Sequence, residues 1–210
     1  MARRVLFICG ILSSLIYVGT DIVAALRWEG YRYTDQGISE LMAIGAPTRP
    51  FMVALYLVFN VLVIAFGIGV WGSAGPKRGL RVTGILLAVY GAFGIVGLLY
   101  FPMYLRGTGS LATDTPHLIA TIVVVLLTLL IIGFGSTARG KGFRLYSIGT
   151  LLALIVFGAL AGMQAPRLQA GLPTPWLGIL ERVNVYGSML WMLVLAVVLL
   201  RGPEGSRPER

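Results

Sequence analysis

Several residue types that enzymes and disulfide-stabilised domains rely on are scarce in this sequence. Its one cysteine, Cys9, cannot form a disulfide within the chain, and its one histidine, His117, cannot build a bis-histidine haem or a multi-histidine zinc site from a single chain. Charged residues make up 12% of the chain, against about 25% in an average protein. The sequence also lacks Walker, H-E-x-x-H, G-x-S-x-G and C-x-x-C motifs. Several common catalytic and cofactor sites are thereby excluded.

The chain is instead dominated by apolar sequence. Hydrophobic residues account for 57% of it, and the mean hydropathy is +0.87. Apolar runs of about 20 residues recur, which is the length that a helix needs to cross about 30 Å of hydrocarbon. This pattern excludes a soluble domain and predicts an all-α, polytopic membrane protein with a bundle of six transmembrane helices. The predicted spans are Val5 to Leu26, Phe51 to Trp71, Leu80 to Phe101, His117 to Phe134, Phe143 to Met163 and Leu180 to Leu200.

The basic residues lie on one side of these spans. The short joints after the second and fourth spans are basic, whereas the joints on the other side balance acids and bases. The formal net charge of +9 therefore falls on the face that carries the N-terminus, which the positive-inside rule makes cytoplasmic. That face carries Arg3, Arg4, Lys77, Arg78, Arg81, Arg139, Lys141, Arg144, Arg201, Arg207 and Arg210 against Glu204 and Glu209.

The charge pattern also predicts location and partners. We expect a multi-pass protein of the cell membrane with both termini in the cytoplasm. Residues 1–201 are expected to form one transmembrane domain, and residues 202–210 a short polar cytoplasmic tail. Because the basic residues are spread over the inner loops beside anionic lipid, we expect membrane lipids and no nucleic acid as partners. The oligomeric state stays open.

Cap residues predict where helices begin. Thr115-Pro116 and Thr174-Pro175 each place a cap residue before a proline, so they are expected to open the fourth and sixth helices. The first outer loop, Arg27 to Pro50, is too long for a plain turn. Within it, Thr34-Asp35 can cap a short amphipathic helix that ends at Gly45 and lies on the outer surface. Its apolar face carries Ile38, Leu41 and Met42, and the opposite side carries Gln36, Ser39 and Glu40.

Ionisable side chains within spans are costly, so each needs a partner or a role. Asp21 lies near the outer end of the first span, on a stripe with Ser14 and Tyr17. It is either paired for packing, for example with Arg27, or functional. His117 lies in the first turn of the fourth span, where the positive helix end favours the neutral imidazole, a base or ligand. The alternative is a hydrogen-bonded spacer.

The sixth span repeats this pattern, with Glu181, Asn184, Ser188 and Trp191 on one side. Such stripes can hold helices together by hydrogen bonds. However, the ionisable groups outside the cytoplasmic face all fall in the outer third of the molecule, so they can converge in one pocket. The candidate catalytic residues are His117, Asp114, Asp21, Ser39, Glu40 and Glu181.

Four short segments together resemble a known family pattern. They are Tyr33 to Leu41 running into Gly45-Ala46-Pro47, Phe101-Pro102, His117, and Glu181-Arg182. The likeness is to the bacterial and archaeal six-helix membrane family known as domain of unknown function 998, and it covers nearly the whole chain. In that family an acidic residue often follows the Phe-Pro pair, where this chain has Met103-Tyr104 and its nearest acid is Asp114. The resemblance implies the six-helix fold and assigns no activity.

Three functions fit the candidate residues. The first is a membrane-embedded hydrolase or transferase for a lipid-like substrate, with His117 as general base, Asp114 or Asp21 orienting it, and Ser39 or a water as nucleophile. In a variant, His117 joins two or three of the carboxylates of Asp21, Glu40 and Glu181 around a divalent metal, and no other cofactor is expected. The second is a carrier or binding protein for a small amphiphile, and the third is a structural or regulatory protein without catalysis.

Overall fold

The structure is a computed structural model of the chain. It describes residues 1–202, apart from the side chain of Leu111, so nearly all of the predicted tail lies outside the described residues. Within that range the protein is all-α, and six helices are long and apolar enough to cross a membrane. The predicted six-helix bundle is therefore confirmed. The six helices are α1 (Ala2–Arg27), α2 (Arg49–Ser73), α3 (Arg78–Tyr100), α4 (Leu111–Gly135), α5 (Lys141–Gly162) and α7 (Leu177–Leu200).

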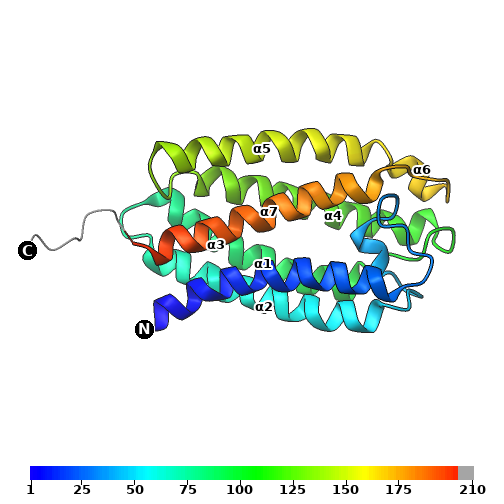
Figure 1. The fold of residues 1–210 in the computed structure, drawn as a ribbon, viewed down its shortest axis with the longest axis horizontal. Helices are drawn as coiled ribbons and strands as arrows, with labels where there is room; N and C mark the ends of the chain where they lie inside the picture. The colour runs from blue at the N-terminus through cyan, green and yellow to red at the C-terminus, as the bar shows by residue number, and fades with distance from the viewer. Residues whose placement is uncertain (203–210) are drawn as a thin grey trace, which may run out of the picture.

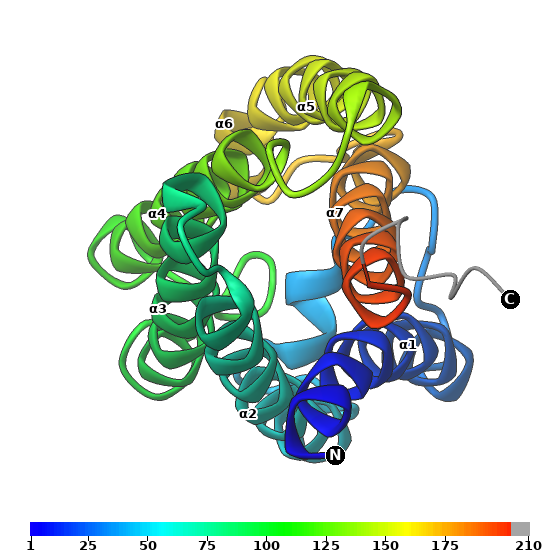
Figure 2. The ribbon, with the colours of Figure 1, turned by 90° about the vertical axis from the view of Figure 1, so that its left-hand side faces the viewer.

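The six long helices form a ring in chain order. Each packs on the next, and α7 closes the ring against α1 (Figure 2). The N-terminus and the end of α7 lie at the same end of the bundle, and the short helix α6 (Ala165–Gln169) lies at the other (Figure 1). The ring is tightest between α2 and α3, where an added Cβ on Gly67 or Gly84 would lie 2.7 Å from the carbonyl oxygen of the other glycine. Small residues at this crossing let the two backbones approach.

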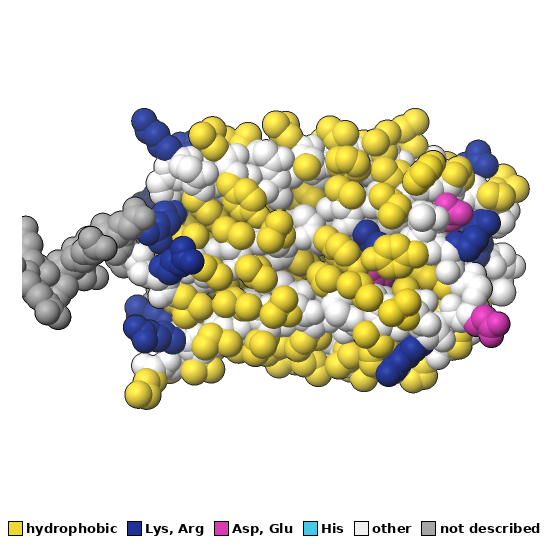
Figure 3. Space-filling model, viewed as in Figure 1, with side chains coloured by type: hydrophobic (Ala, Val, Ile, Leu, Met, Phe, Trp, Pro, Cys, Tyr) yellow, Lys and Arg dark blue, Asp and Glu magenta, His cyan; other side chains and the backbone are white. Residues whose placement is uncertain are grey.

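Charged side chains gather at the two ends of an apolar surface (Figure 3). One end carries the N-terminus, the end of α7 and the basic loops with Lys77, Arg81 and Arg139, and we call it the basic end. The other end carries both signs of charge, and we call it the mixed end. The apolar band between them, with its many exposed large hydrophobic side chains, is the surface expected of a protein surrounded by lipid.

The first outer loop folds into the mouth of the ring at the mixed end instead of lying on the surface (Figure 2). It carries a five-residue 3-10 helix, η1 (Ile38–Met42), capped by Gly37. Ile38, Glu40 and Leu41 are at most 1% exposed. The helix is therefore shorter than expected and is buried. Its apolar side chains are better shielded from water inside the ring of helices than they would be at the membrane interface.

The two expected helix starts differ from the structure. Ser110 caps α4 by accepting the N–H of Thr113, so Asp114 lies in the first turn of the helix and His117 in the second. Pro116 lies inside the helix and costs it one hydrogen bond. Thr174 does not cap α7: its hydroxyl donates to a carbonyl of the first outer loop, and the helix begins three residues later.

A buried amide lies in the middle of the ring between α2 and α3. The side chain of Asn60 is fully buried, and its Nδ2 donates to the carbonyl of Tyr56 at 2.7 Å. Its Oδ1 has no hydrogen-bond donor within residues 1–202 and packs directly on Gly94 of α3, where an added Cβ would overlap with it. Glycine at position 94 is therefore what makes room for this amide.

We predict that Gly94→Ala destabilises the bundle by about 1–3 kcal/mol, because the new methyl group displaces the Asn60 amide inside a packed core. Gly97→Ala is the matched control, since nothing lies within 4 Å of a Cβ at that position. The control is expected to lie within about 1 kcal/mol of the unchanged protein. The measurement is the midpoint of thermal unfolding in detergent, and equal midpoints for the two variants would contradict the prediction.

Candidate functional site

Asp21 of α1 and Arg182 of α7 form a buried ion pair at the mixed end. The guanidinium donates from Nε to Oδ2 at 2.9 Å and from Nη2 to Oδ1 at 3.0 Å, and the two side chains are 0% and 4% exposed. This two-pronged pair joins the first span to the last. The expected partner Arg27 instead lies over the ring of Phe51. Sequence reasoning did not predict Arg182 as the partner of Asp21, although an arginine within an apolar span is itself a signal.

Arg182 also fixes the first outer loop. Its Nη1 donates to the carbonyl oxygens of Tyr33 and Gln36 at 2.7 and 3.1 Å, and its Nη2 donates to the hydroxyl of Tyr31 at 2.9 Å. The guanidinium lies 3.5 Å from the centre of the Tyr33 ring. Burial raises the pKa of the Tyr31 phenol, although the Arg182 hydrogen bond acts to lower it. The phenol is therefore neutral and donates to the carbonyls of Gln36 and Gly37.

Tyr186 completes the shell around Asp21. Its hydroxyl donates a short hydrogen bond to Oδ2 of Asp21 and lies 2.9 Å from the hydroxyl of Tyr33. Asp21 thus accepts three hydrogen bonds from Arg182 and Tyr186 in a site with no exposure to solvent. A carboxylate so fully engaged is suited to holding helices together.

A second arginine neutralises Glu40 of η1. Nη2 of Arg106 lies 2.7 Å from Oε1, and Nε lies 3.3 Å from Oε2. The backbone N–H of Gly37 also donates to Oε1, at 3.0 Å. Since Arg106 belongs to the loop between α3 and α4 and also donates to the carbonyl of Leu172, it ties η1 to two other loops at the mixed end.

Glu181 lies against the start of η1. Its Oε2 accepts the backbone N–H of Ile38 at 3.1 Å, and an added Cβ on Gly37 would overlap with the same oxygen. The hydroxyl of Ser39 lies 3.6 Å from that Cβ position. The structure therefore brings Ser39, Glu40 and Glu181 together around Gly37, with Asp21 held nearby through Arg182. We call this group the η1 cluster.

His117 and Asp114 form a separate group on α4. Nδ1 of His117 lies 3.0 Å from the carbonyl oxygen of Phe101. Because a carbonyl only accepts, Nδ1 carries the hydrogen, and Nε2 is the acceptor in the neutral ring. No hydrogen bond in residues 1–202 joins His117 to a carboxylate or to Ser39. Nor does that part of the chain bring three His, Cys, Asp or Glu side chains close enough to hold a metal ion.

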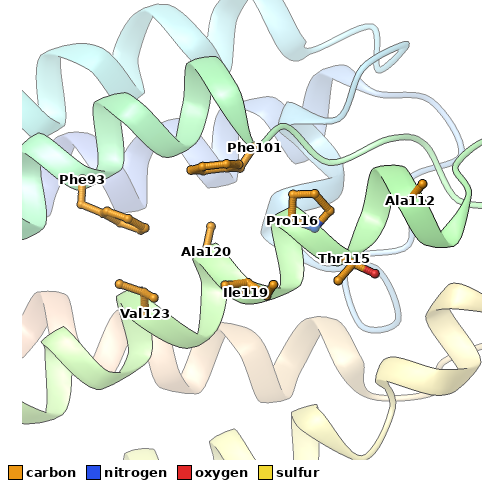
Figure 4. A pocket seen from close by; sticks show the side chains of 8 residues that line it. All are labelled: Phe93, Phe101, Ala112, Thr115, Pro116, Ile119, Ala120 and Val123. Carbon is orange, nitrogen blue, oxygen red and sulfur yellow. The ribbon is translucent and has the colours of Figure 1, made fainter.

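A groove with a volume of about 690 Å³ runs between α3 and α4 near His117 (Figure 4). It opens on the side of α4 that carries Ile119, whose side chain is 57% exposed. Sequence reasoning missed it because its walls are ordinary apolar residues of membrane spans. The walls are Phe93 and Phe101 on one side and Ala112, Thr115, Pro116, Ile119, Ala120 and Val123 of α4 on the other.

A family model described as "Protein of unknown function (DUF998)" matches residues 11–198 of the chain. The chain belongs to the DUF998 family. The match runs from α1 to α7 and so includes the η1 cluster, the Asp21–Arg182 pair and the groove. No curated protein and no solved structure matches the chain.

In this DUF998 protein the segments that carry the family resemblance meet at the mixed end. Gly37 and Glu40 belong to the η1 cluster. Glu181 and Arg182 of α7 bind backbone groups of the first outer loop. Phe101 provides both a wall of the groove and the carbonyl that binds His117. The family pattern therefore corresponds to one connected region at one end of the bundle.

We predict that Arg182→Gln destabilises this DUF998 protein by about 3–5 kcal/mol, because it leaves the Asp21 carboxylate buried without a counter-charge. Arg32→Gln is the control: Arg32 pairs with Asp35 at 3.4 Å, but its side chain is 62% exposed, so the loss is expected to be at most about 1 kcal/mol. The stability of both variants is measured by their folded yield and by their thermal unfolding midpoint in detergent. Similar values for the two variants would show that the Asp21–Arg182 pair does not stabilise the fold.

Proposed function

We propose that this protein binds the acyl chain of a membrane lipid in the groove between α3 and α4. The observation that carries the proposal is the groove itself, whose volume lies within the range of small-molecule sites, about 300–1,000 Å³. Its walls are almost wholly apolar side chains, and it opens on the lipid-facing side of α4. In a bilayer, acyl chains are the molecules that surround such an opening.

The length of the groove supports the same occupant. Its α4 wall runs from Ala112 to Val123, which corresponds to about 16 Å at 1.5 Å per residue. This is about half of the roughly 30 Å thickness of the hydrocarbon core. A groove of this length at the mixed end matches the chain of a lipid in one leaflet, with its head group beside the first turn of α4.

The contacts favour binding over the hydrolase or transferase hypothesis. Catalysis by a histidine and a serine needs the hydroxyl within about 3 Å of the base and a third group that orients the base. The Nδ1 of His117 is instead bound by the carbonyl of Phe101, and Ser39 lies with Glu181 in the η1 cluster. Two of the predicted catalytic carboxylates, Asp21 and Glu40, are held by arginines.

We also propose that the basic end faces the cytoplasm and the mixed end the outside of the cell membrane, which is what the positive-inside rule favours. The groove then opens to the outer leaflet. A lipid that occupies it comes from that leaflet.

We predict opposite labelling of two new cysteines in a Cys9→Ser background. Thr108→Cys lies in an exposed loop at the mixed end and is expected to react with a membrane-impermeant maleimide on intact cells. Thr137→Cys lies in an exposed position at the basic end and is expected to react only after the cells are opened. Labelling in the reverse order would overturn the proposed orientation.

We predict that Ile119→Trp reduces the lipid that co-purifies with the protein by at least about tenfold, because the indole fills the groove. The control is Leu126→Trp on the same helix, since Leu126 is 54% exposed and does not line the groove. Native mass spectrometry of the detergent-purified protein counts bound lipid. Equal lipid retention in both variants would refute the proposed function.

A further inference from the structure

A proline interrupts the hydrogen bonding of α4 where the helix lines the groove. Pro116 lies inside α4 and has no backbone N–H to donate. The carbonyl of Ala112, one turn earlier, therefore lacks the donor that a regular helix would give it. Ala112 and Pro116 both line the groove between α3 and α4. The α4 wall of the groove thus contains a backbone oxygen that can accept a hydrogen bond from a ligand.

This carbonyl lies at the polar end of the groove. Ala112, Thr115 and Pro116 lie at one end of it, and Phe93 and Val123 lie at the other (Figure 4). Thr115 supplies the one side-chain oxygen among the eight lining residues. Ala112 and Thr115 are both exposed. An acyl chain that runs along the groove toward Val123 would place its head group beside them.

The chemistry of the groove wall limits what this head group can be. The described residues that line the groove include no charged side chain, so the lining offers no counter-charge to an ammonium group or a phosphate. A backbone carbonyl accepts hydrogen bonds and does not donate them. The group that matches the carbonyl of Ala112 is therefore neutral and carries an O–H or N–H. In an apolar site, a few such polar contacts fix the orientation of the ligand.

We propose that the lipid in this groove carries a neutral hydrogen-bond donor, an alcohol or an amide N–H, at the head of its alkyl chain and donates it to the carbonyl of Ala112. This inference rests on the proposed acyl-chain site and names the class of lipid that the site takes. Pro116 then determines specificity, because its missing N–H leaves the carbonyl to the ligand. An ether of the same chain fills the groove but lacks this bond.

The test uses the full-length protein in detergent and pairs of ligands that differ in one donor. Dodecanol and dodecyl methyl ether share an alkyl chain, and only the alcohol donates. N-dodecylacetamide and its N-methyl derivative repeat the comparison for an amide, so the tighter of the two donors shows which kind of lipid the groove prefers. Each ligand is titrated as its mole fraction in the micelle. The readout is the shift of each variant's own thermal unfolding midpoint.

Two variants separate the carbonyl from the shape of the groove. Pro116→Ala restores an N–H that bonds the carbonyl of Ala112 within the helix, and it also removes the ring from the groove wall. Val123→Ala is the matched control, because it removes lining volume from the same helix and leaves that carbonyl unchanged. The control is expected to weaken the alcohol and the ether alike.

We predict that the unchanged protein and Val123→Ala bind dodecanol about five- to tenfold more tightly than the ether, and that this ratio falls to about one in Pro116→Ala. Equal binding of alcohol and ether by the unchanged protein would overturn the inference, as would an unchanged ratio in Pro116→Ala. The acyl-chain site would survive either result if Ile119→Trp still blocked both ligands. If Ile119→Trp blocked neither, the acyl-chain site and this inference would fail together.

Discussion

The fold depends on one ion pair inside the membrane-spanning region. Asp21 and Arg182 come from the first and last spans, and both are almost completely buried. Two separate charges at this depth would each be costly, and bringing them together leaves a neutral unit that can lie among apolar side chains. Because α1 and α7 are the first and last spans and pack on each other in the structure, the pair stabilises the closed ring.

The same arginine determines where the first outer loop lies. Arg182 donates to the backbone carbonyls of Tyr33 and Gln36 and so holds the loop against α7. With the loop drawn into the ring, η1 is buried and Glu40 enters an apolar setting. Glu40 then needs its own counter-charge, which Arg106 supplies. One buried pair thus leads to the second, and together they organise the mixed end.

Sequence reasoning predicted the six spans because uninterrupted apolar length is a strong signal that does not depend on which helices pack together. It also found the polar residues of the mixed end, since each interrupts an apolar pattern. It failed where the answer depends on which segments meet in space. The partner of Asp21 is 161 positions away, and the groove is formed by ordinary apolar residues of two different helices. The start of α4 was also predicted wrongly. Thr115-Pro116 is a typical helix start, but the cap of α4 in the structure is Ser110.

How each carboxylate is bound distinguishes the roles of Asp21, Glu40 and Glu181 better than burial or residue type does. Asp21 accepts from Arg182 and Tyr186, so little capacity remains for a ligand, and its role is to hold the ring closed. Glu40 binds Arg106 and the N–H of Gly37, so its role is to hold η1. Glu181 accepts backbone N–H groups at the start of η1, from Ile38 and Ser39, so its role is to hold η1 against α7.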